Sequence, residues 1–395
     1  MKPVLIENAS DMAELLLSFE QEPILAVDTE FFRETSYYPQ LGLIQIASKT
    51  IIACIDPLAF DASTALKEIF LNTGIIKVFH SCSQDLEVLF HTYGVIPAPM
   101  HDTQIAFALL STHDQIGYAN LVERELGISL AKSQTRTNWL KRPLTMQQLE
   151  YAGDDVYYLY TIYHKLIDRL KQTGHYDWFD EDCKKYNLSG CQTATSQALM
   201  FSVNIQSLWQ RVKGSHKLNG KTLAMVQAIA RWREQIAMQT DTTRRRVLAD
   251  ELILRLAHNP PRQTDDINWL SHNRFHFLPG QLETLLQTIQ TVEQSSPEQW
   301  TQNGIDPLSP TEKKLLVRIQ QLINKKAKSL GISASVLAAK KTLESFIKGN
   351  YDIRLLQGWR RDCIGRQLQE QLPSLLVEVN GSLHETVAKE NSFSD

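Results

Sequence analysis

Acidic residues in the first half of the chain have the types and spacing of a metal-ion site. Asp28 and Glu30 occupy alternate positions at the end of the apolar stretch Ile24–Glu30. Because side chains alternate along a strand, both carboxylates are expected on one face, with Cα atoms about 7 Å apart. Two acids so placed repel each other and resist desolvation, and a bound cation would offset that cost. The alternative is a strand end that has reached solvent, where acids are common.

Three further residues could complete such a site. Asp85 is expected in the first turn of a helix after an apolar stretch, where the helix dipole alone also favours an acid. Tyr151 and Asp155 are four residues apart in a helical pattern, so their side chains meet on one helix face. The adjacent Asp154 faces another way and is expected in solvent. Each signal is weak alone, and their order along the chain is what makes them informative.

The elements that must position these residues form a mixed α/β pattern. Strands are expected at Ile24–Glu30, Gly42–Ser48, Ile51–Asp56 and Ile75–His80. Only Lys49 and Thr50 separate the second strand from the third, which predicts a hairpin. Helices are expected around 63–71, at Ser83–Tyr93 before the C-cap Gly94, and at Thr145–Leu170, which opens with the capping box Thr145–Gln148 and stops at Gly174.

Composition excludes several classes of protein. The chain has 395 residues, 43% of them hydrophobic and 22% charged, which suggests two or three globular domains. The longest apolar run, Ile105–Leu110, is six residues long, whereas a membrane-spanning helix needs about 20. The five cysteines form no CxxC pair, which argues against a zinc ribbon and for a reducing, cytosolic location. The N-terminus lacks the basic start of a signal peptide.

Charge divides the chain into two parts of opposite sign. Residues 1–200 contain 15 Lys and Arg against 25 Asp and Glu, and residues 201–395 contain 26 against 19. After about residue 206 the strand pattern disappears, and apolar residues recur every three or four positions, as in amphipathic helices. A metal-using domain followed by polyanion-binding modules would show this division, although chance composition could also produce it.

The order of the motifs resembles the tyrosine-containing subclass of the DEDD exonucleases, and in particular the ribonuclease D family. The resemblance covers about residues 1–190 and is carried by LAVDTEFFRETSYYPQLGLIQIA, FHSCSQDLEVL, DTQIAFALL, SQTRTNWLKRPLT and YAGDDVYYLY. In the rear half, LWQRVKG, KTLAMVQAIARWRE and RRRVLADELILRLA resemble the helical HRDC module of helicases and ribonuclease D. Residues 310–372 resemble a second, more divergent copy, and the tripeptide VLA recurs at 247–249 and 336–338.

This resemblance implies a site for two divalent ions, Mg²⁺ or Mn²⁺. Asp28 would bridge both ions, Glu30 and Asp155 would complete the site of the ion that activates water, and Asp85 would support the second ion through water. Tyr151 would orient the attacking water with its neutral hydroxyl, because a phenol with an ordinary pKa of about 10 is a poor general base. Carboxylates without a histidine or cysteine cluster suit such hard ions.

Other residues are expected to contact RNA, each with a structural alternative. Phe31 and Phe32 could stack on the terminal base or pack at the strand end, and Gln45 and His80 lie on strands beside the acids. The candidates for phosphate contacts are Lys132, Arg136 and Arg142 in a polar stretch of the front half, and Lys213, Arg244 and Arg245 in the rear half.

The predicted architecture is an α/β ribonuclease-H-like 3′-5′ exonuclease domain followed by two all-α HRDC modules. The expected boundaries are 1–172 for the exonuclease domain, 173–205 for a linker, 206–288 for the first module, 289–309 for a second linker, 310–372 for the second module and 373–395 for a tail.

By resemblance, the expected activity is hydrolysis of RNA from its 3′ end to nucleoside 5′-monophosphates, in the processing of tRNA precursors and other small structured RNAs. A cytoplasmic enzyme without membrane association or an obligate protein partner is expected. A DNA-directed exonuclease with the same acids is the first alternative, because 2′-hydroxyl contacts separate the two substrates. An inactive RNA-binding protein is the second, and the presence of all four acids and the tyrosine argues against it.

Overall fold

The computed structural model describes the chain except for residues 131–136, 186–203, 273–276, 301–307 and 392–395, and it describes no side chains at 271–272 and 380–391. The chain divides into two compact units. The first contains Met1–Glu30, Gly42–Gly190 and Pro307–Asp395, and the second contains Phe31–Leu41 and Cys191–Asp306. The first unit therefore joins the predicted α/β domain to the C-terminal helices, and the second holds the central helices.

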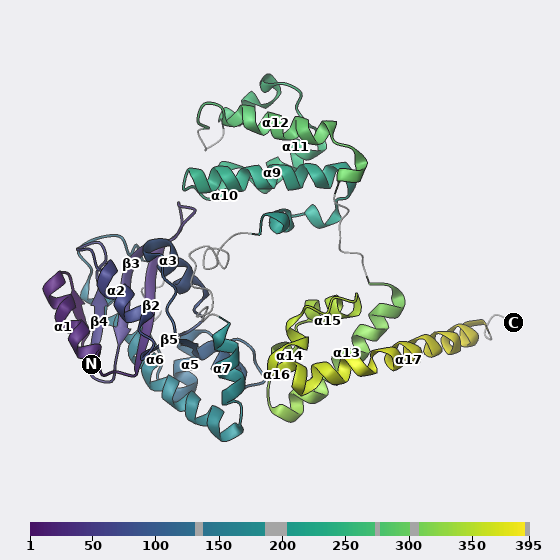
Figure 1. The fold of residues 1–395 in the computed structure, drawn as a ribbon. Helices are drawn as coiled ribbons and strands as arrows, with labels where there is room; N and C mark the ends of the chain where they lie inside the picture. Colours follow the sequence, from purple (N-terminus) through teal and green to yellow (C-terminus); the bar gives the residue numbers. More distant parts are fainter. Residues whose placement is uncertain (131–136, 186–203, 273–276, 301–307, 392–395) are drawn as a thin grey trace. The chain divides into compact units, whose positions relative to one another are not determined.

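A six-stranded mixed sheet lies at the centre of the α/β domain (Figure 1). In sheet order its strands are β1 (Val4–Ile6), β4 (Ile52–Ile55), β3 (Gln40–Ala47), β2 (Ile24–Phe32), β5 (Ile76–Phe79) and β6 (Met100–Asp102). β3 and β4 pair antiparallel, which confirms the predicted hairpin. β2 and β5 pair in parallel, with Ala26 opposite Val78. Their carboxyl ends therefore lie at one edge of the sheet, and Asp28 and Glu30 lie toward that edge.

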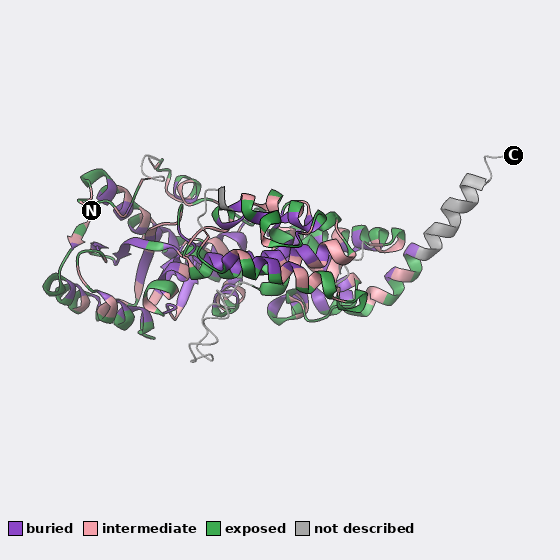
Figure 2. Ribbon diagram, turned by 90° about the horizontal axis from the view of Figure 1, so that it is seen from above, coloured by how far each residue is buried: buried purple, intermediate pink, exposed green. Residues whose placement is uncertain are grey.

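Helix α6 (Met146–Thr173) carries two of the candidate residues and packs on this sheet. Its N-cap Thr145 and Gln148 bond reciprocally, and Gly174 ends the helix in the left-handed conformation with φ of 72°, so both predicted ends are confirmed. Its buried residues Val156 and Leu159 belong to the same apolar cluster as Ala26 of β2. Figure 2 shows this inner layer of the domain as buried. The packing of α6 against β2 therefore also fixes the positions of the candidate residues that the two elements carry.

The other helices of the domain include one in a segment predicted as a linker. They are α1 (Ala9–Phe19), α2 (Ser63–Leu71), α3 (Ser83–Tyr93), α4 (Thr103–Ala108), α5 (Tyr118–Leu126) and α7 (Tyr176–Lys184). α2 and α3 have the predicted bounds. α7 lies within 173–205 and buries Phe179 and Cys183 in the core of the domain. Its many acidic residues hide this apolar face in the sequence.

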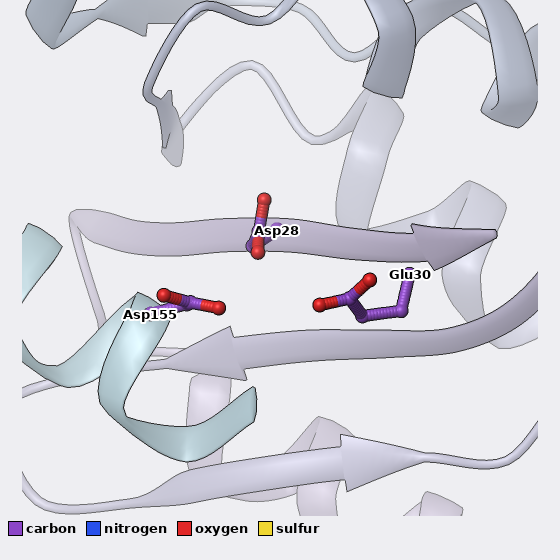
Figure 3. A group of neighbouring side chains, drawn as sticks. All are labelled: Asp28, Glu30 and Asp155. Atoms are coloured by element: carbon purple, nitrogen blue, oxygen red, sulfur yellow. The ribbon is translucent and has the colours of Figure 1, made fainter. Parts of the chain in front are cut away.

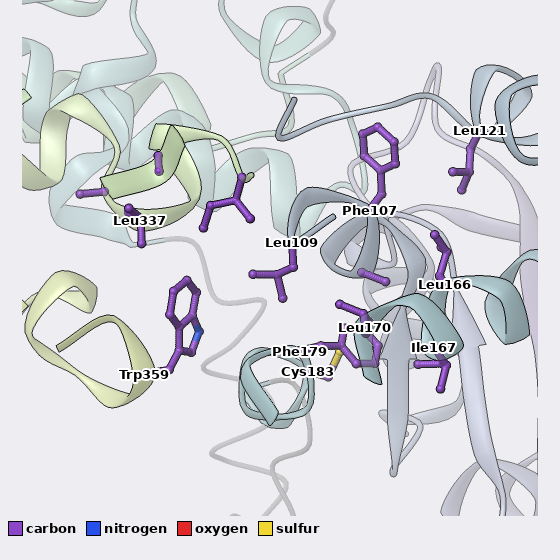
Figure 4. Packing of buried hydrophobic residues seen from close by; sticks show 14 of the residues in the cluster. Phe107, Leu109, Leu121, Leu166, Ile167, Leu170, Phe179, Cys183, Leu337 and Trp359 are labelled. Carbon is purple, nitrogen blue, oxygen red and sulfur yellow. The ribbon is translucent and has the colours of Figure 1, made fainter. Parts of the chain in front are cut away.

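The C-terminal helices, here called the second helical module, pack in the same unit as the α/β domain. They are α13 (Pro310–Leu330), α14 (Ala334–Leu337), α15 (Lys340–Ile347), α16 (Gly358–Arg360), a π-helical turn (Arg361–Gly365) and α17 (Arg366–Asn391). One apolar cluster contains Leu109 and Phe179 of the α/β domain together with Leu337 and Trp359 of the module (Figure 4). The second helical module is therefore continuous with the core of the α/β domain.

The central helices, here called the first helical module, form a core of their own in the second unit. They are a 3₁₀ helix (Ile205–Arg211), α9 (Gly220–Gln239), α10 (Arg244–Val247), α11 (Asp250–His258) and α12 (Gln281–Gln294). Trp209 and Trp232 are buried in this core. Tyr37, from the segment 31–41, also belongs to it. Its backbone N–H and that of Tyr38 donate to Asp241 at 3.0 and 2.9 Å.

The two helical modules share one distinctive break. In each, a long helix is followed by a four-residue helix, two extended residues and a helix of eight or nine residues. The first extended residue is Leu248 in one module, with φ −156° and ψ 119°, and Ala338 in the other, with φ −155° and ψ 120°. Residues 334–347 therefore form two helices and not one continuous helix.

Within the described ranges, every helix is too short or too polar to cross a membrane.

Candidate active site

Three acidic side chains meet between β2 and α6. Asp28 and Glu30 come from β2 and Asp155 from α6, and one carboxylate oxygen of each lies within 4.8 Å of the others. Figure 3 shows the carboxylates of Glu30 and Asp155 pointing toward each other, with Asp28 beside them. The strand period and the helix register predicted from the sequence are therefore both correct at these positions. These three residues are called the carboxylate cluster below.

Asp85 lies beside the carboxylate cluster but not within it. It occupies the first turn of α3 and is buried. Its Oδ1 accepts a hydrogen bond of 2.5 Å from Thr29 Oγ1. Asp85 is nevertheless close enough to Asp28 to raise the pKa of that carboxyl by charge repulsion. The fourth predicted acid thus neighbours the cluster through Asp28.

A cavity of about 400 Å³ opens on the cluster. It is lined by Asp28, Glu30, His80, Gly117, Tyr118, Ala119, Asn120, Leu130, Tyr151, Asp155 and Leu159. Tyr151 therefore faces the same space as the acids, as its spacing from Asp155 predicted. The wall from Gly117 to Asn120, at the start of α5, was not predicted. These residues belong to no motif that links them to the acids in the sequence, and the packing of α5 on α6 brings them here.

Burial and mutual repulsion make the acids costly to ionise. Desolvation, followed by the charges of Asp155 and Asp85, raises the pKa of Glu30 to about 9. Desolvation raises the pKa of Asp155 to about 7, and Asp154 adds to the effect. Desolvation also raises the pKa of Asp85 to about 7, although the hydrogen bond from Thr29 opposes the rise. Burial and the neighbouring acids raise the pKa of Asp28 well above its usual range.

A divalent cation fits this arrangement. The donor set consists of carboxylate oxygens, which Mg²⁺ and Mn²⁺ prefer. Each acid is half-buried close to others of the same charge, and among the described residues no Lys or Arg forms an ion pair with the cluster. A bound cation would supply the opposite charge that keeps the carboxylates ionised.

Among the residues expected to contact RNA, His80 lines the cavity, and Gln45 is enclosed in the sheet. The ring of His80 bonds Thr103 Oγ1 at 2.9 Å through Nδ1 and the Ile116 carbonyl at 3.0 Å through Nε2. Gln45 is fully buried, and neither atom of its amide has a partner within the described part of the chain. Phe31 and Phe32 end β2 and are half-buried.

Arg142 is held entirely by protein groups. Its Nε and Nη2 form a two-pronged pair with the buried Asp56, and its other N–H groups donate to the carbonyl oxygens of Gly42, Trp139 and Lys141. All five donors of the guanidinium are thereby used, so none remains for a phosphate. Lys132 and Arg136 lie outside the described residues.

The basic candidates of the rear half lie around one cavity of the first helical module. The cavity is about 430 Å³ and is lined by Arg211, Lys213, Arg233, Arg244, Arg245, Asp250 and Glu251. Arg244 pairs with Glu234, and its guanidinium lies 4.8 Å from the centre of the Tyr37 ring. Arg233 pairs with Asp250 at 2.7 Å. Arg211, Lys213 and Arg245 thus supply the basic groups of this cavity beyond those two ion pairs.

Comparison with known proteins identifies the domain families to which the front and central parts of the chain belong. Residues 3–171 match the 3′-5′ exonuclease domain family, and residues 222–270 match the HRDC domain family. The chain is 32% identical over 377 residues to ribonuclease D of Sphingobium indicum, with 92% of each chain covered. It is also 32% identical over 376 residues to ribonuclease D of Zymomonas mobilis, with the same coverage.

A solved structure extends the agreement to the whole chain. Escherichia coli RNase D, described as an exoribonuclease involved in structured RNA processing, matches with a TM-score of 0.80 and 29% identity. The match covers 95% of this chain and 99% of that one. The α/β domain and the helical modules therefore recur together in that structure. With relatives 32% identical over 92% of the chain, this chain belongs to the ribonuclease D family.

Proposed function

We propose that this protein removes nucleotides from the 3′ ends of structured RNAs, tRNA precursors among them, and releases nucleoside 5′-monophosphates. The observation that carries the proposal is the carboxylate cluster, three acids from two elements with oxygens within 4.8 Å of one another, on a cavity of about 400 Å³. The cluster lies within an exonuclease domain.

The acids would hold two divalent ions. Glu30 and Asp155 would bind one ion with Asp28, and Asp85 would support the other. The ions would lower the pKa of the attacking water and stabilise the charge on the leaving 3′ oxygen. Asp28 is suited to the bridging position because both Asp155 and Asp85 act on its carboxyl group.

Tyr151 would orient the water. It shares the cavity with the acids and lies one helical turn before Asp155. Its neutral hydroxyl can accept a hydrogen bond from the water and fix the direction of attack on the phosphorus. Orientation is worth more here than proton transfer, since a phenol holds its proton at neutral pH.

The helical modules would hold the body of the RNA. We infer that residues 310–372 are a second HRDC-like module, supported by the break that Leu248 and Ala338 share. Lys213, Arg244 and Arg245 border the basic cavity of the first module and would attract phosphates without reading sequence. Phe31, Phe32 and His80 remain candidates for contacts to the terminal nucleotide.

The test follows a tRNA precursor with a 3′ extension, labelled at its 5′ end, in Mg²⁺. Asp155→Ala removes a carboxylate of the cluster, whereas Asp154→Ala removes an exposed neighbour on the same helix. We expect shortening from the 3′ end with the unchanged protein and with Asp154→Ala. We expect the rate of shortening to fall in Asp155→Ala by more than the roughly 10–100-fold that is typical when a residue that only hydrogen-bonds a metal ligand is removed. Retained activity in Asp155→Ala would refute the site, and faster digestion of matched DNA would refute the substrate.

A further inference from the structure

Asp85 is the acid whose position needs an explanation. The other three are brought together by β2 and α6, but Asp85 comes from α3, which begins after β5. It stands apart from the three-residue cluster. A buried carboxylate on a short side chain can turn about two bonds, and its usefulness to an ion depends on which way it turns. Something must therefore hold both the carboxylate and the helix that carries it.

The carboxylate itself is held by Thr29. This residue lies between Asp28 and Glu30, so strand alternation directs its side chain away from theirs. Its hydroxyl donates to Asp85 Oδ1 at 2.5 Å, and both residues are buried. The strand that supplies two acids of the cluster thus also fixes the orientation of the neighbouring acid, through the residue between them.

The start of α3 is held by Asp102. Its two carboxylate oxygens accept the backbone N–H groups of Ser81 at 2.8 Å and of Cys82 at 3.0 Å. Ser81 has φ of 62°, a left-handed conformation that is unfavourable for a non-glycine residue. Asp102 comes from the end of β6, beside β5 in the sheet, and is buried. It therefore stabilises the strained turn that places Asp85 four residues later.

We propose that Thr29 and Asp102 are positioning residues that aim Asp85 at the second divalent ion. This inference rests on the proposed two-ion site. Neither residue touches the ion; Thr29 acts through the Asp85 carboxylate and Asp102 through the turn before α3. Removal of either hydrogen-bonding group would weaken the binding of the second ion, whereas Asp28, Glu30 and Asp155 would remain available to the first.

The experiment counts ions bound to the protein without RNA, by calorimetry and by electron paramagnetic resonance with Mn²⁺. Thr29→Val keeps the shape of the side chain and removes the hydroxyl, and Thr29→Ser restores the hydroxyl. Tyr163→Phe is the control, because it removes another buried hydroxyl of the domain, 2.7 Å from His101 Nδ1. Asp102→Asn tests the turn. In parallel, the Mg²⁺ concentration that gives half the maximal rate is measured on a short RNA.

We expect Thr29→Val and Asp102→Asn to lower the affinity for the more weakly bound ion about 10-fold and to leave the affinity for the more tightly bound ion unchanged. Both variants should also raise the half-saturating Mg²⁺ concentration. Thr29→Ser and Tyr163→Phe should behave like the unchanged protein. Normal binding of both ions in Thr29→Val, or equal weakening in Tyr163→Phe, would overturn the inference. Turnover retained in Asp28→Asn would instead overturn the proposed function. An inactive Asp28→Asn beside a normal Thr29→Val would remove this inference alone.

Discussion

At the scale of single residues, the carboxylate cluster and the neighbouring Asp85 should make the metal-free protein less stable as the pH rises. The pKa of Glu30 is about 9, and those of Asp85 and Asp155 are about 7, whereas unfolded acids have pKa values of about 4. From about pH 4 to about pH 9 the folded chain therefore binds more protons than the unfolded chain. Linkage then requires the free energy of unfolding to fall as the pH rises through this window.

This is measured as the melting temperature in EDTA from about pH 5 to about pH 8. We expect a decline, and we expect Mg²⁺ to reverse most of it at about pH 8, because the ion binds only the folded chain. Glu30→Gln should flatten the decline, and Glu34→Gln, which changes an exposed acid four residues later in the chain, should leave it unchanged. An equally steep decline in Glu30→Gln would contradict the assignment.

Single residues also show where sequence reasoning stops. Asp28, Glu30 and Asp155 could be placed together because each lies in an element with a regular period. Arg142 could not be placed, because its partner Asp56 is 86 residues away and no local pattern records that pairing. Gln45 was predicted as an RNA contact from its place beside the acids. It is buried instead, because its exposure depends on which face of the sheet other elements cover.

At the scale of elements, local signals located the ends of α2, α3 and α6, and they failed where packing alone makes the element. The capping box and the glycine caps are chemical features of the sequence itself. β1 and β6 have three residues each, too few to show a period. α7 has nine residues, four of them acidic, and is ordered by burying one face between α6 and the second helical module.

Substitutions in the contact between α7 and α16 should be among those that most reduce the stability of the first unit. Arg360 is buried and donates to both oxygens of Asp182 at 2.7 and 2.8 Å, and Trp178 stacks on Trp359 with ring centres 4.5 Å apart. Asp182→Ala would leave the Arg360 charge buried and unpaired, which costs about 3–5 kcal/mol. Arg354, half-exposed, would lose its pair as well.

Urea denaturation measures the free energy of unfolding in this comparison. Lys184→Ala is the matched control on the same helix, because the pair of Lys184 with Asp180 is largely exposed and such pairs contribute about 0–1 kcal/mol. If the free energy of unfolding falls no further in Asp182→Ala than in Lys184→Ala, this contact does not hold the second helical module.

At the scale of the whole molecule, the division of charge seen in the sequence corresponds to a division between the domain that carries the acids and the helical modules. The acidic front half contains the carboxylate cluster, and the basic rear half contains the two helical modules. The sequence could not show that these modules differ in their attachment. The second shares one apolar cluster with the α/β domain, and the first has a core of its own. Truncation after about residue 200 would therefore remove part of the α/β domain's packing along with both modules.

Removal of residues 206–288 alone, with a Gly and Ser linker in their place, separates RNA binding from catalysis more cleanly. The α/β domain keeps its packing against the second helical module, so we expect cleavage of a short RNA to continue at a similar rate. Affinity for a tRNA-length RNA should fall, and its dependence on salt should become shallower, since the slope decreases by about one for each phosphate that the protein no longer neutralises.

Because the deletion also removes the groups that bind Tyr37, a second variant is needed with the chain intact. Lys213→Glu with Arg245→Glu, in which Arg244 keeps its pair with Glu234, should reproduce the weaker affinity and the shallower slope. Unchanged binding in both variants would place the RNA on other residues, and failure of the second variant to cleave the short RNA would show that the first module also serves the chemical step.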